Sequence, residues 1–181
     1  MKTESTVMYV ARLALTLLII TGVVAVALAG VNMITAPAIE ALNAQKTQEA
    51  IELVLPGGGE AIDFPETALV STVYAGDTGY AVEVTPGGFD NTITMMVGVD
   101  KGGNVLGISI IKHTETAGLG AVAAAGTPAG ESFRGQFVGA SGSVSVTKDG
   151  GEMDAITGAT ITSRAICAGV NAALEVVAKM G

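Results

Sequence analysis

The feature that most constrains this chain is an uncharged stretch near its N-terminus, residues 13–39, which is bounded by Arg12 and Glu40. Its first part, residues 13–31, is almost purely apolar, and the threonines within it can satisfy their hydroxyls on a helix backbone. A helix that spans a membrane needs about 20 such residues. We therefore expect a transmembrane anchor that contacts the lipid bilayer.

A cleaved signal peptide is the alternative for this stretch, because Ala27-Leu28-Ala29 has the small-x-small form of a cleavage site. We favour a retained anchor, since the apolar run continues past that point, beyond the usual length of a signal-peptide core. Lys2 and Arg12 precede the span, and Lys46 is the only basic residue soon after it. This bias predicts a single pass with a cytoplasmic N-terminus and an extracytoplasmic body in the cell (inner/cytoplasmic) membrane.

Composition excludes several classes of function. The net charge of −8 and an aromatic content of only 4% argue against nucleic acid as a partner, which requires basic surfaces and stacking side chains. The chain has one cysteine, Cys167, and one histidine, His113, so it cannot build an iron–sulfur cluster or a multi-histidine metal site by itself. We expect a buried thiol at Cys167 and a structural role for His113, and any redox chemistry must come from a bound cofactor.

The remainder of the sequence predicts an α+β domain. Pro37 is well placed to open a juxtamembrane helix, which Pro56 and the following glycines end. Four β-rich runs follow, at residues 68–74, 80–85, 93–99 and 105–111, and they read as two antiparallel hairpins with Gly-containing turns. Residues 161–180 have the apolar period of a helix packed on a sheet. We expect three parts: a tail and anchor at 1–35, a juxtamembrane helix and linker at 36–60, and an extracytoplasmic domain at 61–181.

Two stretches that follow the predicted strands could bind a ligand. Residues 154–160, Asp-Ala-Ile-Thr-Gly-Ala-Thr, lie just before the last predicted helix, where unpaired backbone N–H groups favour an anion. Residues 113–120, His-Thr-Glu-Thr-Ala-Gly-Leu-Gly, have glycines that permit close approach of a flat or phosphorylated ligand. An ordinary helix cap and an ordinary surface loop are the alternatives that these residues leave open.

Together the two stretches resemble a known family. Residues 154–160 match the flavinylation motif Asp-x-x-(Ser/Thr)-Gly-Ala-Thr of FMN-binding domains, and residues 113–120 resemble the accompanying His-x-Glu-Thr-x-Gly-Leu-Gly signature. One departure is Ala117, where the family often has proline. With its N-terminal span, the whole chain resembles the RnfG (or RsxG) family of the ion-translocating ferredoxin:NAD oxidoreductase (Rnf) complexes. It is also similar to the NqrC family of Na⁺-translocating NADH:quinone oxidoreductases, whose members are usually longer.

The resemblance implies a covalent flavin. Thr160 is expected to carry FMN through a phosphoester, attached by an ApbE-type flavin transferase that works from FAD. The chain would then serve as a one-electron relay between neighbouring carriers of the Rnf-type membrane complex, together with its other subunits, and no metal is implied. The expected cofactor-binding residues begin with Thr160 and with Asp154, Gly158 and Ala159 as recognition elements for the transferase. Thr157 is expected at the same site, and Thr162 and Ser163 are expected against the phosphodiester. The expected contacts to the ring and ribityl chain are Glu115, Thr116, Gly118, Leu119 and Gly120.

Two further functions are compatible with the residues. One is a membrane-anchored module that binds FMN or another ligand noncovalently, as a sensor or scaffold. The other is a self-contained flavin reductase with its own substrate. The sequence disfavours the reductase, because no nucleotide-binding glycine fingerprint follows a strand and no catalytic acid–base pair stands out.

Overall fold

The computed structural model describes residues 6–180, and the chain divides into two compact units between Ala44 and Gln45. Lys2, one of the basic residues behind the predicted orientation, lies outside the described residues. The two units differ in where their apolar side chains lie. In the first unit they are exposed along a helix, and in the second they are buried between helices and a sheet.

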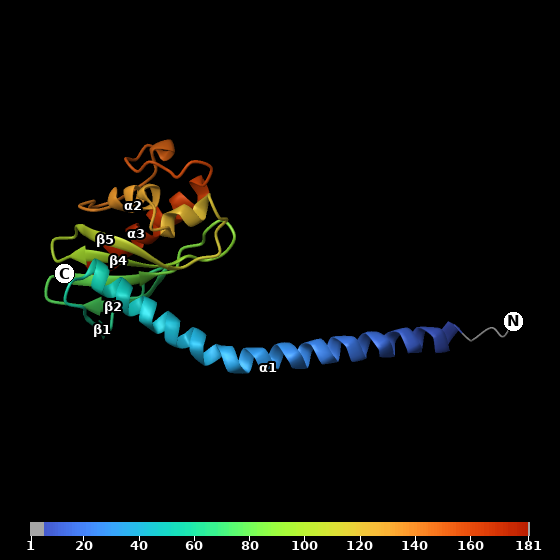
Figure 1. Ribbon diagram of the computed structural model, residues 1–181. Helices are drawn as coiled ribbons and strands as arrows, with labels where there is room; N and C mark the ends of the chain where they lie inside the picture. The colour runs from blue at the N-terminus through green and yellow to red at the C-terminus, as the bar shows by residue number, and fades with distance from the viewer. Residues whose placement is uncertain (1–5, 181) are drawn as a thin grey trace. The chain divides into compact units, whose positions relative to one another are not determined.

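Helix α1 (Thr6–Val54) contains the whole predicted anchor (Figure 1). Its apolar side chains from Met8 to Ile34 are exposed, and it is long and apolar enough to cross a membrane. The hydroxyls of Thr16, Thr21 and Thr35 each donate to a carbonyl one turn earlier, so these three hydroxyls are satisfied within the helix. These properties support membrane association.

Pro37 lies inside α1, so the expectation that it begins a separate helix is wrong. A proline in a helix interior removes one backbone hydrogen bond and crowds the preceding turn. Here the helix continues through it, because Ala36, Ala38 and Ala41 beside it are strong helix formers and the apolar segment before it is already helical.

Residues 60–112 form a five-stranded antiparallel sheet with strand order β1-β2-β3-β4-β5. The strands are β1 (Glu60–Ile62), β2 (Val70–Ala75), β3 (Gly79–Val84), β4 (Thr94–Asp100) and β5 (Val105–Lys112). The two predicted hairpins are confirmed as β2–β3 and β4–β5. Strand β1 was not predicted, because it is three mostly exposed residues without an alternating pattern.

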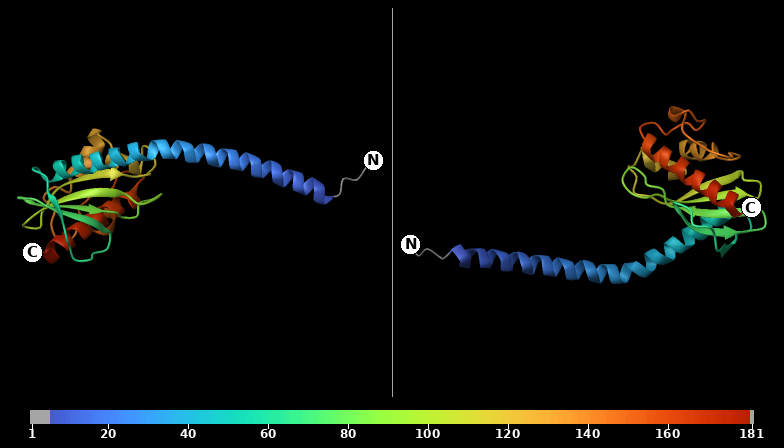
Figure 2. Two further views of the ribbon diagram at one scale, coloured as in Figure 1. Left: turned by 90° about the horizontal axis from the view of Figure 1, so that it is seen from below. Right: turned by 180° about the vertical axis from the view of Figure 1, so that it is seen from behind.

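Helices cover both faces of this sheet (Figures 1 and 2). On one face lies α3 (Thr160–Met180), whose apolar side, including Ile166 and Val170, packs against the buried valines of β3 and β4. On the other face lies the last turn of α1, where Ile51 and Val54 pack on Ala81 and Met96. The predicted α+β fold, an N-terminal apolar helix followed by an antiparallel sheet packed by helices, is therefore confirmed.

Shorter helices connect the sheet to α3. They are η1 (Gly120–Ala124), α2 (Pro128–Gly135) and η2 (Thr147–Asp149). Cys167, on the buried side of α3, is 4% exposed, and burial raises the pKa of its thiol to about 11. The expectation of a buried thiol is confirmed, and this thiol is protonated at neutral pH.

Candidate functional site

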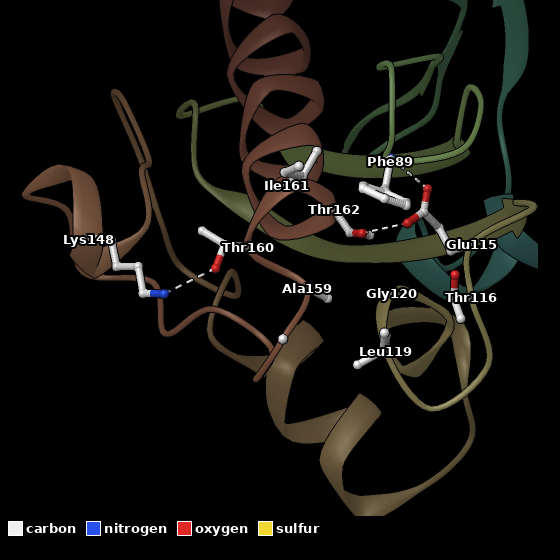
Figure 3. A pocket seen from close by; sticks show the side chains of 11 residues that line it. Phe89, Glu115, Thr116, Leu119, Gly120, Lys148, Ala159, Thr160, Ile161 and Thr162 are labelled. Atoms are coloured by element: carbon white, nitrogen blue, oxygen red, sulfur yellow. Dashed lines mark hydrogen bonds between the residues drawn. The ribbon is translucent and has the colours of Figure 1, made fainter.

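A pocket of about 270 Å³ lies where four segments meet: the β3–β4 connection, the loop after β5, the η2 loop and the first turn of α3 (Figure 3). Both predicted ligand-binding stretches contribute to it. The residues that line it are Phe89, Glu115, Thr116, Leu119, Gly120, Lys148, Gly158, Ala159, Thr160, Ile161 and Thr162.

The floor of the pocket is the N-terminus of α3. The helix begins at Thr160, and its first backbone bond between turns runs from the Ser163 N–H to the Ala159 carbonyl, at 3.0 Å. The N–H groups of Thr160, Ile161 and Thr162 precede that bond and so have no carbonyl partner within the helix. This arrangement offers donors and the positive end of the helix dipole to an anion.

A tight turn brings the chain into this helix. Gly158 has φ +76°, and a Cβ there would lie 2.9 Å from Leu119 Cδ2. The Ser163 hydroxyl accepts from the Ile156 N–H and donates to the Ala159 carbonyl, both at 3.0 Å. Gly158 thus lets the motif approach the loop that carries Leu119, and the two hydrogen bonds of the Ser163 hydroxyl stabilise the turn.

One end of the pocket is a buried carboxylate network. Glu115 is 8% exposed, and its Oε1 accepts from the Phe89 N–H at 2.8 Å. Its Oε2 accepts from the Thr162 hydroxyl at 2.5 Å. A Cβ on Gly120 would overlap both the Glu115 carboxylate and the Thr162 hydroxyl, so only glycine fits beside this network. Glu115 therefore joins the loop after β5 to both the β3–β4 connection and α3.

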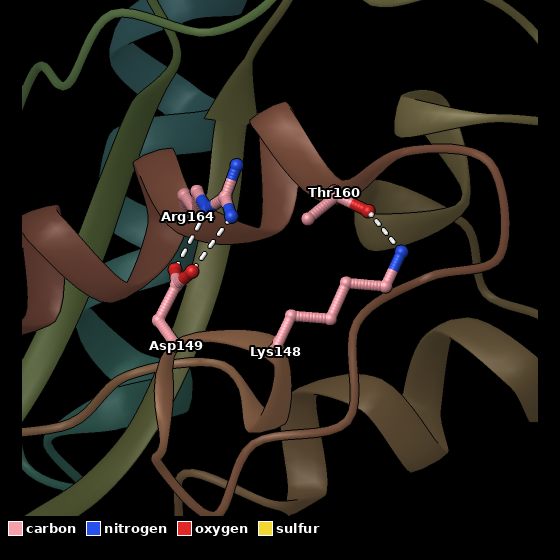
Figure 4. A network of polar contacts seen from close by, with 4 residues as sticks. All are labelled: Lys148, Asp149, Thr160 and Arg164. Carbon is pink, nitrogen blue, oxygen red and sulfur yellow. Dashed lines mark hydrogen bonds and ion pairs between the residues drawn. The ribbon is translucent and has the colours of Figure 1, made fainter.

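The other end of the pocket is exposed and cationic. The Lys148 ammonium donates to Thr160 Oγ1 at 3.2 Å (Figure 4). The next residue, Asp149, accepts two bonds from Arg164 on the second turn of α3, at 2.7 and 2.6 Å. The Arg164 guanidinium holds the pKa of the Asp149 carboxyl below its usual range, chiefly by these hydrogen bonds.

The motif and the start of α3 carry four hydroxyls, at residues 157, 160, 162 and 163, and they differ in access to the pocket. Thr162 is 1% exposed and bonded to Glu115, and Ser163 is fully buried beneath the turn. Thr157 is exposed, but it lines a neighbouring pocket of about 410 Å³. Thr160 is half-buried and lines the pocket with its hydroxyl near Lys148. Thr160 is thus the one of the four that is both accessible and directed at this pocket.

Comparison with known proteins points to a flavin-binding family. Residues 88–175 match the family model of the FMN-binding domain. The chain is 35% identical to the G subunit of the Na⁺-translocating ferredoxin:NAD⁺ oxidoreductase complex of Acetobacterium woodii, over 91% of this chain and 90% of that protein. It is 31% identical to the G subunit of an ion-translocating oxidoreductase complex of Methanosarcina acetivorans, over 93% and 94% of the two chains.

The chain belongs to the RnfG family of ion-translocating oxidoreductase complexes. Within this family, the matched FMN-binding domain spans the whole pocket, from Phe89 to Thr162. The resemblance inferred from the two sequence motifs is therefore confirmed.

The pocket of this RnfG family member suits the phosphate of FMN. The first three residues of α3, Thr160 to Thr162, line it, and the N-terminus of a helix stabilises an anion. Gly120 and Gly158 remove the side chains that would otherwise crowd the Thr162 hydroxyl and Leu119. Leu119 is 42% exposed and Phe89 is 67% exposed, so apolar surface is available at the pocket for a flat ring. The residues present therefore fit FMN.

The pocket includes most of the residues predicted from the sequence. Glu115, Thr116, Leu119, Gly120, Gly158, Ala159, Thr160 and Thr162 line it. Asp154, Thr157 and Gly118 line the neighbouring pocket instead, and Ser163 is buried under the turn. His113 does not line the main pocket, and its Nδ1 is buried without a hydrogen-bond partner among the described residues.

The pocket also includes Ile161, next to Thr160, and two residues that sequence reasoning missed, Phe89 and Lys148. Phe89 follows Gly87-Gly88 in the β3–β4 connection, 26 residues before the glutamate that its N–H contacts. Lys148 lies 12 residues before Thr160, in a segment with no motif. Neither residue has a local pattern that marks it as part of a site, because both reach the pocket through tertiary contacts.

Proposed function

We propose that this chain is an electron-transfer subunit of a membrane-bound, ion-translocating ferredoxin:NAD oxidoreductase complex, with FMN attached covalently to Thr160 as a one-electron relay. The observation that carries the proposal is the position of Thr160. Among the four hydroxyls of residues 157–163, it alone is accessible and directed at the pocket, and it is the first residue of α3. The N–H groups of that helix start are available to its phosphoester.

Attachment requires a bond between Thr160 Oγ1 and phosphorus. With FAD as donor, the Oγ1–P bond forms, the pyrophosphate P–O bond breaks, AMP leaves and the hydroxyl proton passes to a base. A threonine hydroxyl needs such a base to act as a nucleophile. Lys148 donates to this hydroxyl, and no His, Asp or Glu side chain bonds to it among the described residues. We therefore assign the base to a separate ApbE-type flavin transferase.

Two residues of the motif suit a role in recognition by that transferase. Asp154 and Thr157 have exposed side chains, and they line the neighbouring pocket. The backbone of Asp154 is held by Gln136, whose amide accepts from the Asp154 N–H at 2.7 Å. We infer that this fixed, exposed segment is read by the transferase, while Gly158 and Ala159 give it access to Thr160.

The bound FMN would supply reversible one-electron chemistry, and the chain supplies its position and surroundings. We infer that Leu119 packs on the ring, with Thr116 and the backbone of Gly118 and Gly120 near the ring and ribityl chain. Both carboxylate oxygens of Glu115 are already bonded to protein groups. Glu115 would therefore hold the loop in place, and the ring contacts would come from its neighbours.

We place the domain outside the cytoplasm, anchored by α1 with its N-terminus in the cytoplasm. The exposed apolar surface of α1 supports the anchor, and Arg12 before the span supports the orientation. In this proposal residues 1–35 are tail and anchor, 36–60 the juxtamembrane segment and 61–181 the flavin domain. The other subunits of the complex would supply and accept the electrons. Accessibility of Lys2 and Lys179 to a membrane-impermeant amine reagent in intact cells tests the orientation, with only Lys179 expected to react.

The covalent attachment is tested by intact mass. The full chain, made with and without the transferase, is compared with Thr160→Ala and with Thr157→Ala as the matched control. We expect an adduct of FMN minus water in the parent and in Thr157→Ala, only with transferase, and none in Thr160→Ala. Flavin that co-purifies but is released on denaturation would instead indicate a noncovalent FMN-binding module. An adduct that persists in Thr160→Ala would refute the assignment.

A further inference from the structure

Lys148 has no role in the family motifs, yet its ammonium group is directed at the oxygen atom on which the proposed function depends. It lies in η2 and reaches the first residue of α3, where Nζ donates to Thr160 Oγ1 at 3.2 Å (Figure 4). A neutral, half-buried hydroxyl does not need a cation as a partner, because water can satisfy it. The position of this charge therefore suggests that Lys148 meets an anion at the same place.

The loop that carries Lys148 is fixed on both sides. Asp149 is held by two hydrogen bonds to Arg164 of α3. The Thr147 N–H donates to the Met153 carbonyl at 2.9 Å, and a Cβ on Gly151 would overlap Ser145. The two sides of the loop are therefore in close contact. The lysine thus starts from a defined backbone position beside the helix N-terminus.

The charges around the pocket make Lys148 distinctive. It is the one basic residue among those that line the pocket, in a chain whose net charge is −8. The acidic residue of the pocket, Glu115, has both oxygens bonded to groups at the other end. A helix N-terminus supplies about half a unit of positive charge, and an ammonium group adds a full one. Both charges favour an anion such as a phosphate at the Thr160 end of the pocket.

We propose, on the basis of the proposed function, that Lys148 is the cationic partner of the flavin phosphate at Thr160. The Asp149–Arg164 pair positions it by holding the η2 loop against α3. The ammonium group holds the phosphate of a flavin before attachment and stays beside the phosphodiester afterwards. The side chain acts on the phosphate and not on the ring.

The test separates phosphate binding from covalent attachment. It uses the full chain in detergent with Thr160→Ala, which cannot form the ester, and measures the affinities for FMN and for riboflavin by flavin fluorescence. These ligands differ only in the phosphate. We expect FMN to bind about tenfold more tightly than riboflavin, as one charge-assisted contact allows. Lys148→Gln should reduce this preference to below about threefold, while Lys148→Arg should keep most of it.

The control is Lys101→Gln, in the β4–β5 turn, because Lys101 is exposed and does not line the pocket. It should leave the FMN preference unchanged. In Asp149→Asn, weaker positioning of the loop should reduce the preference by less than Lys148→Gln does. Riboflavin affinity should be the same in all these variants, which shows that the pocket is still folded.

Two outcomes overturn the inference: no preference for FMN in the chain that retains Lys148, or an equal preference in Lys148→Gln. Both are independent of the ester, which is judged by the mass of the chain with Thr160 intact. If that adduct forms and the Lys148 variants do not differ, only the inference fails. If no adduct forms and FMN preference still depends on Lys148, only the covalent attachment fails.

Discussion

The two ends of the pocket are built in opposite ways (Figure 3). At the Glu115 end, a buried carboxylate joins three segments, and each of its oxygens has a protein donor. At the Thr160 end, an accessible hydroxyl, an ammonium group and the helix N–H groups still have capacity to bind a ligand. We infer from this difference that the first end holds the pocket together, and we propose that the second end receives the ligand. Substitutions at the first should alter stability, and substitutions at the second should alter loading with flavin.

The largest loss of stability is expected for Glu115→Ala. The change leaves the buried Thr162 hydroxyl and the part-buried Phe89 N–H without their acceptor, at a cost of about 3 kcal/mol in the free energy of unfolding. Urea unfolding followed by circular dichroism measures it. Glu66→Ala, which removes an exposed carboxylate, should change stability by less than about 0.5 kcal/mol. A Glu115→Ala variant as stable as the parent would contradict the structural role of this end.

A smaller loss is expected for Gly120→Ala. The added methyl group would overlap the Glu115 carboxylate and the Thr162 hydroxyl, and forcing it into this packed site costs about 2 kcal/mol. The thermal midpoint of the full chain should fall accordingly. If the midpoint does not change, the loop after β5 can move away from α3, and the buried end is less rigid than described.

Gly118→Ala is the matched substitution two residues earlier in the same loop. Gly118 has φ +75°, but a Cβ there meets nothing within 4 Å, so only backbone strain of about 1 kcal/mol is expected. Comparison of the two alanine variants in one thermal unfolding series separates crowding at the Glu115 network from strain in the loop. Gly118→Ala should be the more stable of the two, and the reverse order would remove the argument from crowding.

The sequence predicts only part of the difference between the Glu115 end and the Thr160 end of the pocket. The motif at residues 154–160 and the Gly118-Leu119-Gly120 loop are found because each is a local pattern, and they meet in one pocket. Lys148 and Phe89 cannot be found in this way, since their partners lie 12 and 26 residues away and only the fold brings them together. The same reason explains why the sequence suggests a ligand contact at Glu115, although its oxygens are bonded within the protein.

The fold shows the same limit. The hairpins β2–β3 and β4–β5 and helix α3 follow from period and turn residues, and they are confirmed. Helix α1 and helix α3 are both apolar enough to pass for membrane spans, but α3 is mostly buried in the domain and α1 is exposed. Hydropathy alone does not separate the two. The amphipathic period of α3, with exposed Arg164 and Glu175, does so.

The smallest effect on flavin loading is expected from loss of the Asp149–Arg164 ion pair. Because the folded protein holds the pKa of Asp149 below its usual range, the pair contributes at neutral pH, above the unfolded pKa. Its contribution is lost as the pH falls through the lowered value. At neutral pH, the transferase should load slightly less flavin onto Asp149→Asn than onto the parent. FMN binding measured by fluorescence should likewise be slightly weaker in Asp149→Asn. Equal flavin loading of the parent and of Asp149→Asn at neutral pH would show that the Asp149–Arg164 pair does not position the η2 loop.

The most direct test of the account is the site of the flavin on the chain. The full-length protein, loaded by the transferase, is digested, and the flavin-bearing peptide is fragmented by tandem mass spectrometry. We predict FMN minus water on Thr160, with Thr157, Thr162 and Ser163 unmodified, because Thr160 alone of these four is both accessible and directed at the pocket. A flavin mapped to Thr157 or Thr162, or a chain that the transferase leaves without flavin, would contradict it.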